Sequence, residues 1–339
     1  MSRVASRVHG RPVPLSSHAP AAHNALNKDV APPAAELPGS VAAVLAACPE
    51  EFSCGCDLRR HRPTHRSPAS TTAAAAGIRL RAALCYWGLT RSLRAVQPTH
   101  EAHLQRVLRA HGIDTRTYVH TWRTANGSQN VWGQALAVRN EPADAKLLAP
   151  HIWAEEDEAP FLAKLAAEWP TYFDAVTARR THAGRVHTLS PDVVRNHLCS
   201  LESLRRCYAL ALSDTSWRPD FVLFVRPDLL LTADLPVTRL LDLAPNELLV
   251  PSTDSWGGVN DRFAAMRAPR AGVYAERISL AAAFRSDRAA SSGRIKPETL
   301  LKYAADGAGL KPVLLTPNEF CVRIARPDGA VVHASTWRR

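Results

Sequence analysis

The sequence predicts an α/β fold with a mainly parallel sheet that carries helices on both faces. From about residue 78 the chain alternates short apolar runs with longer helical patterns, as chains that form parallel sheets do. The apolar runs are four to six residues long and lack polar alternation, which is typical of strands buried on both faces. The clearest helix, 190–212, leads into the clearest strand, 220–225, and this succession is the core of the prediction.

The other elements follow from apolar spacing and from end signals. Strands are expected at 81–88, 116–122, 220–225, 247–251, 311–317 and 319–325, and helices at 99–112, 190–212 and 297–309. Thr99 and Ser190 are the expected N-caps of the first two helices. Pro191 and Pro297 fit the first turn of their helices, where a missing N–H costs nothing.

The N-terminal part of the chain is predicted to be a disordered leader. Residues 1–76 hold nine of the 25 prolines and show no sustained periodicity, so one folded domain is expected at 77–339. The first 28 residues contain no acidic side chain, a composition shared by organellar transit peptides and by ordinary basic tails. No apolar stretch reaches the roughly 20 residues of a membrane span. A soluble intracellular location is the default expectation.

Charge and cysteine content narrow the class of protein. The chain has 339 residues and a formal net charge of +11, which suits polyanionic partners such as phosphates and nucleotides but also an ordinary basic surface. It lacks a dense Lys/Arg run with interleaved aromatics, so specific nucleic-acid binding is not expected. The seven cysteines are odd in number and irregularly spaced, which argues against a secreted disulfide scaffold and for reduced thiols.

Arg226 and Asp228 follow the clearest strand, in the stretch "DFVLFVRPDLLL". Ligands of open α/β sheets bind beyond the carboxyl ends of the strands. A carboxylate there can hold Mg²⁺ or Mn²⁺, and an arginine can bind phosphate oxygens in a bidentate way. Pro227 limits how Asp228 points. Taken alone, the two charged residues fit the start of a surface turn slightly better than a ligand site.

Six segments follow one another over about 250 residues: "YWGLTRSL", "YVHTW", "LCSLESLRRCYAL", "DFVLFVRPDLLL", "VPSTDSWGGVNDRFAAM" and "KPETLLKYAADGAGL". This ordered set resembles glycosyltransferases of the GT-A fold, including capsular-type and algal-virus-type members. No single segment is specific for this family, whereas the order of all six is. The resemblance implies a Rossmann-like GT-A sheet at 77–339 and a nucleotide-sugar donor.

The resemblance places the donor nucleotide and its diphosphate near the turn after the first strand. The residues expected there are Trp87, Gly88, Arg91, Ser92, Ser203, Arg206 and Arg226. Many GT-A enzymes hold a metal through an Asp-x-Asp motif, whereas this chain has Arg226 in the first position. Mn²⁺ or Mg²⁺ binding would then rest on Asp228 and, by the resemblance, on a late histidine, His333. Alternatively, Arg226 replaces part of the charge of the metal.

The loop "WGGVNDRFA" is expected beside the transferred sugar or the acceptor. Trp256, Gly257, Gly258 and Asn260 are the expected contacts there. Asp261 would bind sugar hydroxyls or deprotonate the acceptor; it also fits as the N-cap of a short helix at 262–266. Glu298 is the rival base, although a carboxylate in the first turn of a helix is also explained by the helix dipole.

The leading hypothesis is therefore a glycosyltransferase that moves a sugar from a nucleotide-diphosphate donor to a hydroxyl acceptor on a glycan or another glycoconjugate. A catalytically inactive module that binds nucleotide sugars or glycans is the first alternative. A nucleotidyltransferase is the second, but the sequence lacks its usual glycine-rich phosphate loop. Nothing in the sequence indicates the sugar, the acceptor, the stereochemical course or the oligomeric state.

Overall fold

The computed structural model describes residues 79–124, 140–168, 179–182, 185–188, 191–287, 295–325 and 331–332. The predicted leader lies outside these ranges, so its disorder and the domain boundary at residue 77 stay predictions. The strands are β1 Arg81–Trp87, β2 Asp114–Arg123, β3 Ile152–Asp157, β4 Arg179–His182, β5 Arg185–Thr188, β6 Phe221–Val225, β7 Leu229–Leu231, β8 Glu247–Pro251, β9 Phe263–Arg267, β10 Lys311–Leu315, β11 Val322–Ala325 and β12 Val331–Val332.

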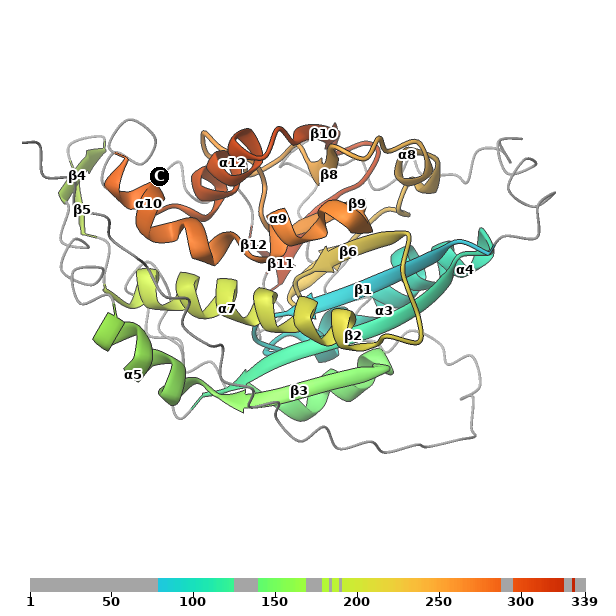
Figure 1. The fold of residues 1–339 in the computed structure, drawn as a ribbon, viewed down its shortest axis with the longest axis horizontal. Helices are drawn as coiled ribbons and strands as arrows, with labels where there is room; N and C mark the ends of the chain where they lie inside the picture. Colours follow the sequence, from blue (N-terminus) through green and yellow to red (C-terminus); the bar gives the residue numbers. More distant parts are fainter. Residues whose placement is uncertain are drawn as a thin grey trace, which may run out of the picture. The chain divides into compact units, whose positions relative to one another are not determined.

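Helices connect most of these strands (Figure 1). The α-helices are α3 Leu93–His100, α4 Arg106–Ala110, α5 Glu158–Glu168, α7 Pro191–Ser213, α8 Val237–Leu241, α9 Ala271–Ala275, α10 Ala281–Ser286 and α12 Pro297–Gly307. Shorter 3₁₀ or π segments are η2 Glu101–Gln105, η3 Pro142–Leu148, η5 Ala268–Arg270 and η6 Arg277–Leu280.

A mainly parallel sheet of seven strands, in the order β10-β8-β9-β6-β1-β2-β3, organises the described residues. β9 pairs antiparallel with β6 and with β8, whereas the other neighbouring strands pair in parallel. β9 alone therefore runs against the other strands of this sheet. The predicted α/β class with a mainly parallel sheet is confirmed.

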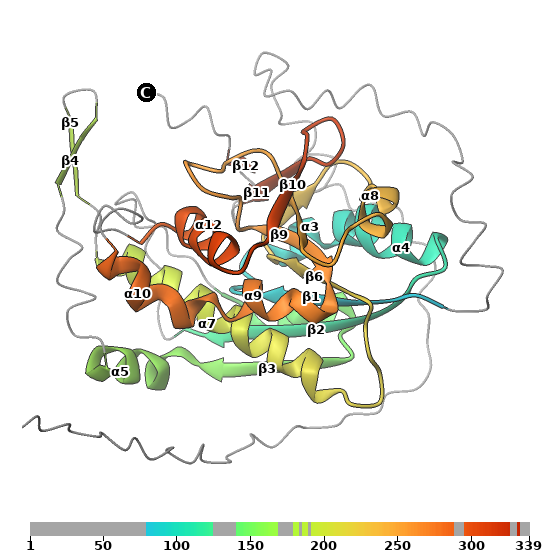
Figure 2. The same ribbon diagram turned by 45° about the horizontal axis from the view of Figure 1, so that its top comes forward.

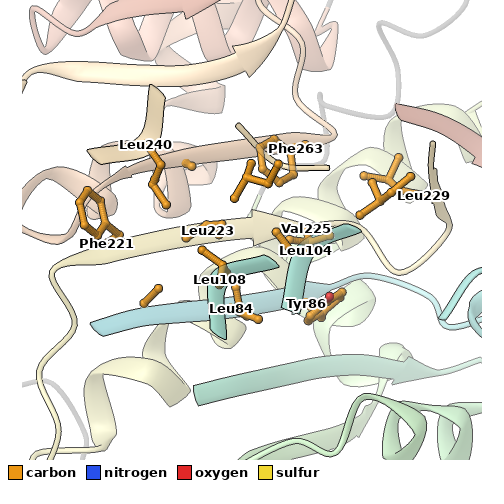
Figure 3. Close-up of a cluster of buried hydrophobic side chains, with 14 of the residues drawn as sticks. Leu84, Tyr86, Leu104, Leu108, Phe221, Leu223, Val225, Leu229, Leu240 and Phe263 are labelled. Carbon is orange, nitrogen blue, oxygen red and sulfur yellow. The ribbon is translucent and has the colours of Figure 1, made fainter. Parts of the chain in front are cut away.

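One face of the sheet carries a core formed with α3, η2 and α4. Leu84 and Tyr86 of β1 point into it, together with Leu223 of β6. Leu104 and Leu108 pack on them from the helical side (Figure 3). Alternate residues of a strand point to opposite faces, so the even-numbered positions of β1 all belong to this cluster.

The opposite face carries a second core, formed with α7, α9 and α12. Ala83, Cys85 and Trp87, the buried odd-numbered positions of β1, point into it. Leu204 and Cys207 of α7 belong to the same cluster. Figure 2 shows α7 along β1 and β2 and α3 on the other side of the sheet. Helices on both faces explain why the strands read as uninterrupted apolar runs.

Two local predictions are wrong. The first helix begins at Leu93 rather than at Thr99, because Leu93 and Val96 already form a buried apolar face one to two turns earlier. Thr99 does not cap it; its hydroxyl donates to the Val96 carbonyl at 2.7 Å. The helix considered for 262–266 is strand β9, whose residues 263–266 are all buried between β6 and β8.

The described cysteines differ in their chemical state. Cys85, Cys199 and Cys207 are free and buried. Cys321 is disulfide-bonded, which corrects the expectation of a reduced thiol at this position. An odd number of irregularly spaced cysteines argues against a disulfide scaffold, but it does not exclude one individual disulfide. Among the helices of the described residues, none has the length and apolar content needed to cross a lipid bilayer.

Candidate functional site

The carboxyl ends of β1, β2 and β6 meet at one edge of the central sheet. Trp87 at the end of β1 pairs with His120 of β2, and Tyr86 pairs with Val225 at the end of β6. β9 runs the other way and starts here, because Phe263 also pairs with Val225. The loop before β9 therefore reaches the same edge. We call the segments 88–92, 226–228 and 252–262 together the strand-end edge.

The Asp228 carboxylate is bracketed by two guanidinium groups. Nε and Nη2 of Arg226 donate to its Oδ1 and Oδ2 at 3.0 and 2.6 Å, and Nη2 of Arg91 donates to Oδ2 at 3.1 Å. Burial alone would raise the pKa of Asp228, but the charges of Arg226 and Arg91 outweigh burial and lower the pKa to about 2. Asp228 is thus ionised at neutral pH, and the two arginines leave one positive charge in excess.

Strand β11 holds both the Asp228 backbone and the turn that carries Arg91. The Ala325 amide donates to the Asp228 carbonyl at 2.8 Å, and the Ser92 hydroxyl donates to the Ala325 carbonyl at 2.8 Å. β7 begins directly after Asp228 and pairs antiparallel with β11. Ser92 was predicted to contact the nucleotide-sugar donor. Its hydroxyl instead holds the turn that carries Arg91.

Trp87 and Gly88, at the end of β1, are both buried in the protein. The Trp87 ring lies in the core under α7, and its Nε1 has no hydrogen-bond partner among the described residues. Gly88 adopts a φ of +102°, a conformation that side chains disfavour. Its amide donates to Ser203 Oγ at 2.8 Å. The structure therefore joins two predicted donor residues, Gly88 and Ser203, to each other.

Arg206 is held apart from the Asp228 group. Its Nε donates to Glu202 Oε1 at 2.8 Å, and its Nη1 forms an ion pair with Glu156. The guanidinium also lies 4.8 Å from the centre of the Trp122 ring. No contact within the described residues links Arg206 to Arg91 or Asp228. A diphosphate that reached Arg206 would have to compete with two carboxylates.

The loop between β8 and β9 combines an exposed aromatic ring with a fixed backbone. The Trp256 side chain is 50% exposed and its φ is +41°, and Gly257 follows with a φ of +86°. Asn260 is buried: its Nδ2 donates to the Thr253 carbonyl at 2.7 Å and its Oδ1 accepts from the Arg262 amide at 2.9 Å. Asn260 therefore shapes the loop, whereas Trp256 offers a ring to solvent.

Gly258 packs directly against the first turn of α12, and this gives a prediction. A Cβ at Gly258 would lie 2.1 Å from the Glu298 carbonyl oxygen, which accepts from the Val259 amide at 3.0 Å. Because the obstacle is backbone, Gly258→Ala is expected to lower the free energy of unfolding by about 2–3 kcal/mol. In the control Gly307→Ala, the new Cβ meets no atom within 4 Å. Urea unfolding compares the two variants, and equal stabilities would contradict the packing.

Asp261 and Glu298 form a buried pair of carboxyl groups, 6% and 9% exposed. Burial first, and the charge of Asp261 second, raise the pKa of Glu298 to about 8; the charges of Arg262 and Lys296 oppose the shift. Glu298 therefore holds a proton at neutral pH and loses it when the pH rises slightly above neutral. Such a group is suited to acid–base chemistry at physiological pH.

Two residues that the sequence did not single out complete this cluster. The fully buried Arg277 has Nη2 at 3.9 Å from Asp261 Oδ2 and donates from Nη1 to the Tyr274 carbonyl at 2.6 Å. His197 is also buried; burial first lowers its pKa to about 4, against the charge of Asp261, so it is uncharged at neutral pH. Nothing in the sequence around either residue distinguishes it from a surface side chain.

Comparison with known proteins adds little to this geometry. No protein-family model matches the chain, and no curated protein matches it. Among solved structures, the chain is similar to mouse xyloside xylosyltransferase 1 in its apo form, at 10% identity and a TM-score of 0.34 over 70% of this chain and 85% of that one. A likeness of this size shows no family. The geometry of the strand-end edge therefore has to carry the functional argument.

The described residues do not fit a divalent metal at Asp228. Both of its oxygens accept hydrogen bonds from arginine, so a cation would have to displace a guanidinium group. Within the described residues, no group of three or more His, Cys, Asp or Glu side chains is arranged to hold a metal ion. The other predicted ligand, His333, lies outside the described residues. Mn²⁺ or Mg²⁺ binding stays a prediction.

Proposed function

We propose that the chain is a glycosyltransferase that moves a sugar from a nucleotide-diphosphate-sugar donor to a hydroxyl acceptor. The observation that carries the proposal is the Asp261–Glu298 pair beside the arginine-bracketed end of β6. The backbone joins the two groups, because the Arg226 amide donates to the Arg262 carbonyl at 3.2 Å. Sugar transfer needs positive charge for the leaving diphosphate and a group for the proton of the acceptor. The resemblance of the sequence to GT-A enzymes supports the same assignment.

On the donor side, Arg91 and Arg226 bind the diphosphate. The Arg91 and Arg226 side chains remain partly exposed, at 28% and 23%, although both contact Asp228. Guanidinium groups match phosphate oxygens in a bidentate way and keep their charge at any physiological pH. Asp228 holds the two arginines at the right separation, and the excess positive charge attracts the donor. The diphosphate is thus bound by arginine charge rather than by an acidic motif.

On the acceptor side, Asp261, or Glu298 after it has lost its own proton, takes the proton of the acceptor hydroxyl. The acceptor oxygen forms a bond to the anomeric carbon of the sugar while the bond from that carbon to the diphosphate oxygen breaks. The electron pair of the broken bond stays on the diphosphate, beside Arg91 and Arg226. The hydroxyl proton passes to Asp261 or to ionised Glu298. Trp256 presents its exposed ring as a stacking surface for a sugar of the acceptor.

A catalytically inactive nucleotide-sugar-binding module is the second candidate, and one observation favours it. Asp228 stands where GT-A enzymes use an acid for chemistry, yet both of its oxygens are engaged by arginine. A binding module would retain the arginines and the exposed Trp256 ring. It would not require the proton-exchanging pair of Asp261 and Glu298.

A screen of nucleotide-sugar donors tests the proposal. The release of nucleoside diphosphate is measured with Mn²⁺, with Mg²⁺ and with EDTA, in the presence of simple glycan acceptors. We expect turnover of at least one donor, and a loss of roughly 100-fold in Asp261→Asn or Glu298→Gln, because each removes a proton-exchanging group. Asp306→Asn, on the exposed side of α12, is the control that keeps activity.

The outcomes separate the candidate functions. Donor binding by calorimetry without turnover or donor hydrolysis contradicts the transferase and supports the binding module. Full activity in both carboxylate variants would remove Asp261 and Glu298 from the chemistry. Activity that survives EDTA supports the arginine-based binding of the diphosphate, whereas strict dependence on Mn²⁺ or Mg²⁺ supports the metal predicted at Asp228 and His333.

A further inference from the structure

Hydrogen-bonded and ion-paired side chains on β3, β2 and α7 lead from the protein surface to the amide of Gly88, in the turn after β1. Glu156 of β3 faces His120 of β2, with Oε1 at 3.3 Å from Nε2. His120 Nδ1 lies 2.8 Å from Ser203 Oγ on α7. Ser203 Oγ in turn accepts from the Gly88 amide at 2.8 Å. Glu156 is the partly exposed end of this line of side chains, whereas His120 and Ser203 have no exposed surface.

The charge states of His120 and Glu156 follow from their surroundings. Burial first lowers the pKa of His120, despite the nearby Glu156 charge, so the ring is uncharged at neutral pH. The contact with His120 first, and the charge of Arg206 later, lower the pKa of Glu156, which is therefore ionised. Ser203 Oγ lies 2.8 Å from His120 Nδ1 and 3.0 Å from the His120 carbonyl oxygen, to which its hydroxyl donates. Ser203 is therefore bound to His120 in either tautomer of the ring.

The line ends at the turn that presents Arg91. Gly88 follows β1 directly, and its φ of +102° sets the course of the chain toward residues 89–92. Three residues later, Arg91 reaches Asp228 at 3.1 Å. The Gly88 amide is buried, so without Ser203 it would lose its hydrogen-bond acceptor at a cost of about 1–3 kcal/mol. The turn would then shift, and Arg91 with it.

We propose that Ser203, His120 and Glu156 are positioning residues for the donor diphosphate, because together they hold the Gly88 turn and so place Arg91. The inference rests on the proposed function and gives Ser203 a different role from the direct nucleotide contact expected from the sequence. Ser203 is wholly buried and its hydroxyl is engaged by Gly88 and His120. It acts on the donor through Arg91.

Binding of inorganic pyrophosphate by the full chain, measured by calorimetry, tests the inference. Pyrophosphate probes the diphosphate contacts without a choice of nucleotide or sugar. Ser203→Ala is expected to weaken pyrophosphate binding about tenfold, because the Arg91 turn is no longer fixed. Glu156→Gln, at the partly exposed end, is expected to weaken it about threefold and serves as the second variant if Ser203→Ala does not fold.

Cys207→Ala is the matched control. Cys207 lies one turn further along α7, is fully buried, and joins α7 to the strands through contacts of its Sγ with the Tyr86 and Tyr118 carbonyls at 3.1 and 3.3 Å. Cys207→Ala removes a buried contact of α7 without touching Gly88. It is expected to lower thermal stability, like Ser203→Ala, but to leave pyrophosphate affinity within about twofold of the wild type.

The possible outcomes are distinct. A loss of affinity confined to Ser203→Ala and Glu156→Gln supports the inference. Equal affinities in all proteins, an equal loss in Ser203→Ala and Cys207→Ala, or no binding of pyrophosphate by the wild type overturn it. The proposed function is decided separately, by turnover in the donor screen. Turnover of a donor combined with any of the overturning results keeps the transferase and removes the positioning role.

Discussion

Asp228→Asn is expected to lower the rate of sugar transfer roughly 100-fold. Asparagine keeps the shape of the side chain but removes the charge that holds Arg91 and Arg226 together, so the two guanidinium groups repel each other and leave the positions that bind diphosphate. The free energy of unfolding should fall by about 2 kcal/mol, because a buried charge partner is lost while the arginines keep some solvent contact. Initial rates of nucleoside diphosphate release and urea unfolding measure the two effects.

Asp214→Asn provides a closely matched control. Asp214 accepts a hydrogen bond from Arg116 of β2, with side-chain exposures of 5% and 28%, against 3% and 28% for Asp228 and Arg91. Hydrogen bonds from Arg116, Ser216 and Tyr118 overcome burial and lower the pKa of Asp214 to about 2. It lies near the amino ends of the strands, so its variant should lose stability but keep transfer. Equal rates in the two variants would remove Asp228 from the donor site.

The contribution of Glu298 to stability is lost as pH rises from 4.5 to 8, and we expect it to lower the stability of the protein between pH 7 and pH 8, where buried histidines such as His197 are uncharged in both states. The pKa of Glu298 is raised from an ordinary 4.5 to about 8 by burial first and by the charge of Asp261 second. Below pH 8 the folded protein keeps a proton that the unfolded chain has already lost above pH 4.5, so rising pH favours the unfolded chain. The full shift corresponds to roughly 5 kcal/mol, and the slope disappears once Glu298 is ionised in both states.

Glu298→Gln should flatten this pH dependence. Unfolding free energies of the wild type and the variant are compared from pH 6 to pH 9, a range in which Asp228 and Asp214 stay ionised. The variant should become the more stable protein toward pH 8, because its buried amide does not have to lose a proton. Asp306→Asn on the exposed side of α12 is expected to keep the wild-type slope. A slope that persists in Glu298→Gln would show that Glu298 is not the group that titrates.

Strong local patterns made much of the fold predictable. Strand β6 has apolar residues at every position, β8 has them at every position after Glu247, and α7 has a long apolar stripe, so their places in the sequence were clear. β9 was not, because "FAAMR" has alanines where a strand signal needs branched or aromatic residues. Its strand character comes from its position between β6 and β8, which no local pattern encodes. The start of α3 was obscured by Pro98, which lies inside the helix.

The candidate site was predictable only where it follows a strand. Arg226 and Asp228 were found because they end β6, and Arg91 because it follows β1. The partnership of Arg91 with Asp228 could not be read from the sequence, since 137 residues separate them. Arg277 and His197 remained hidden because burial, rather than residue type, makes them unusual. Ser203 was noticed for its helix face, but its actual partner is the backbone of Gly88.

The position of β9 ties assembly of the fold to assembly of the chemistry. β9 is made after β6 and β8, yet it lies between them and is their only link in the sheet. Until it inserts, β6 exposes an unpaired apolar edge, the kind of surface that promotes aggregation. The same insertion brings Asp261 to the strand-end edge. A chain in which β9 has not yet inserted therefore lacks the Asp261–Glu298 pair.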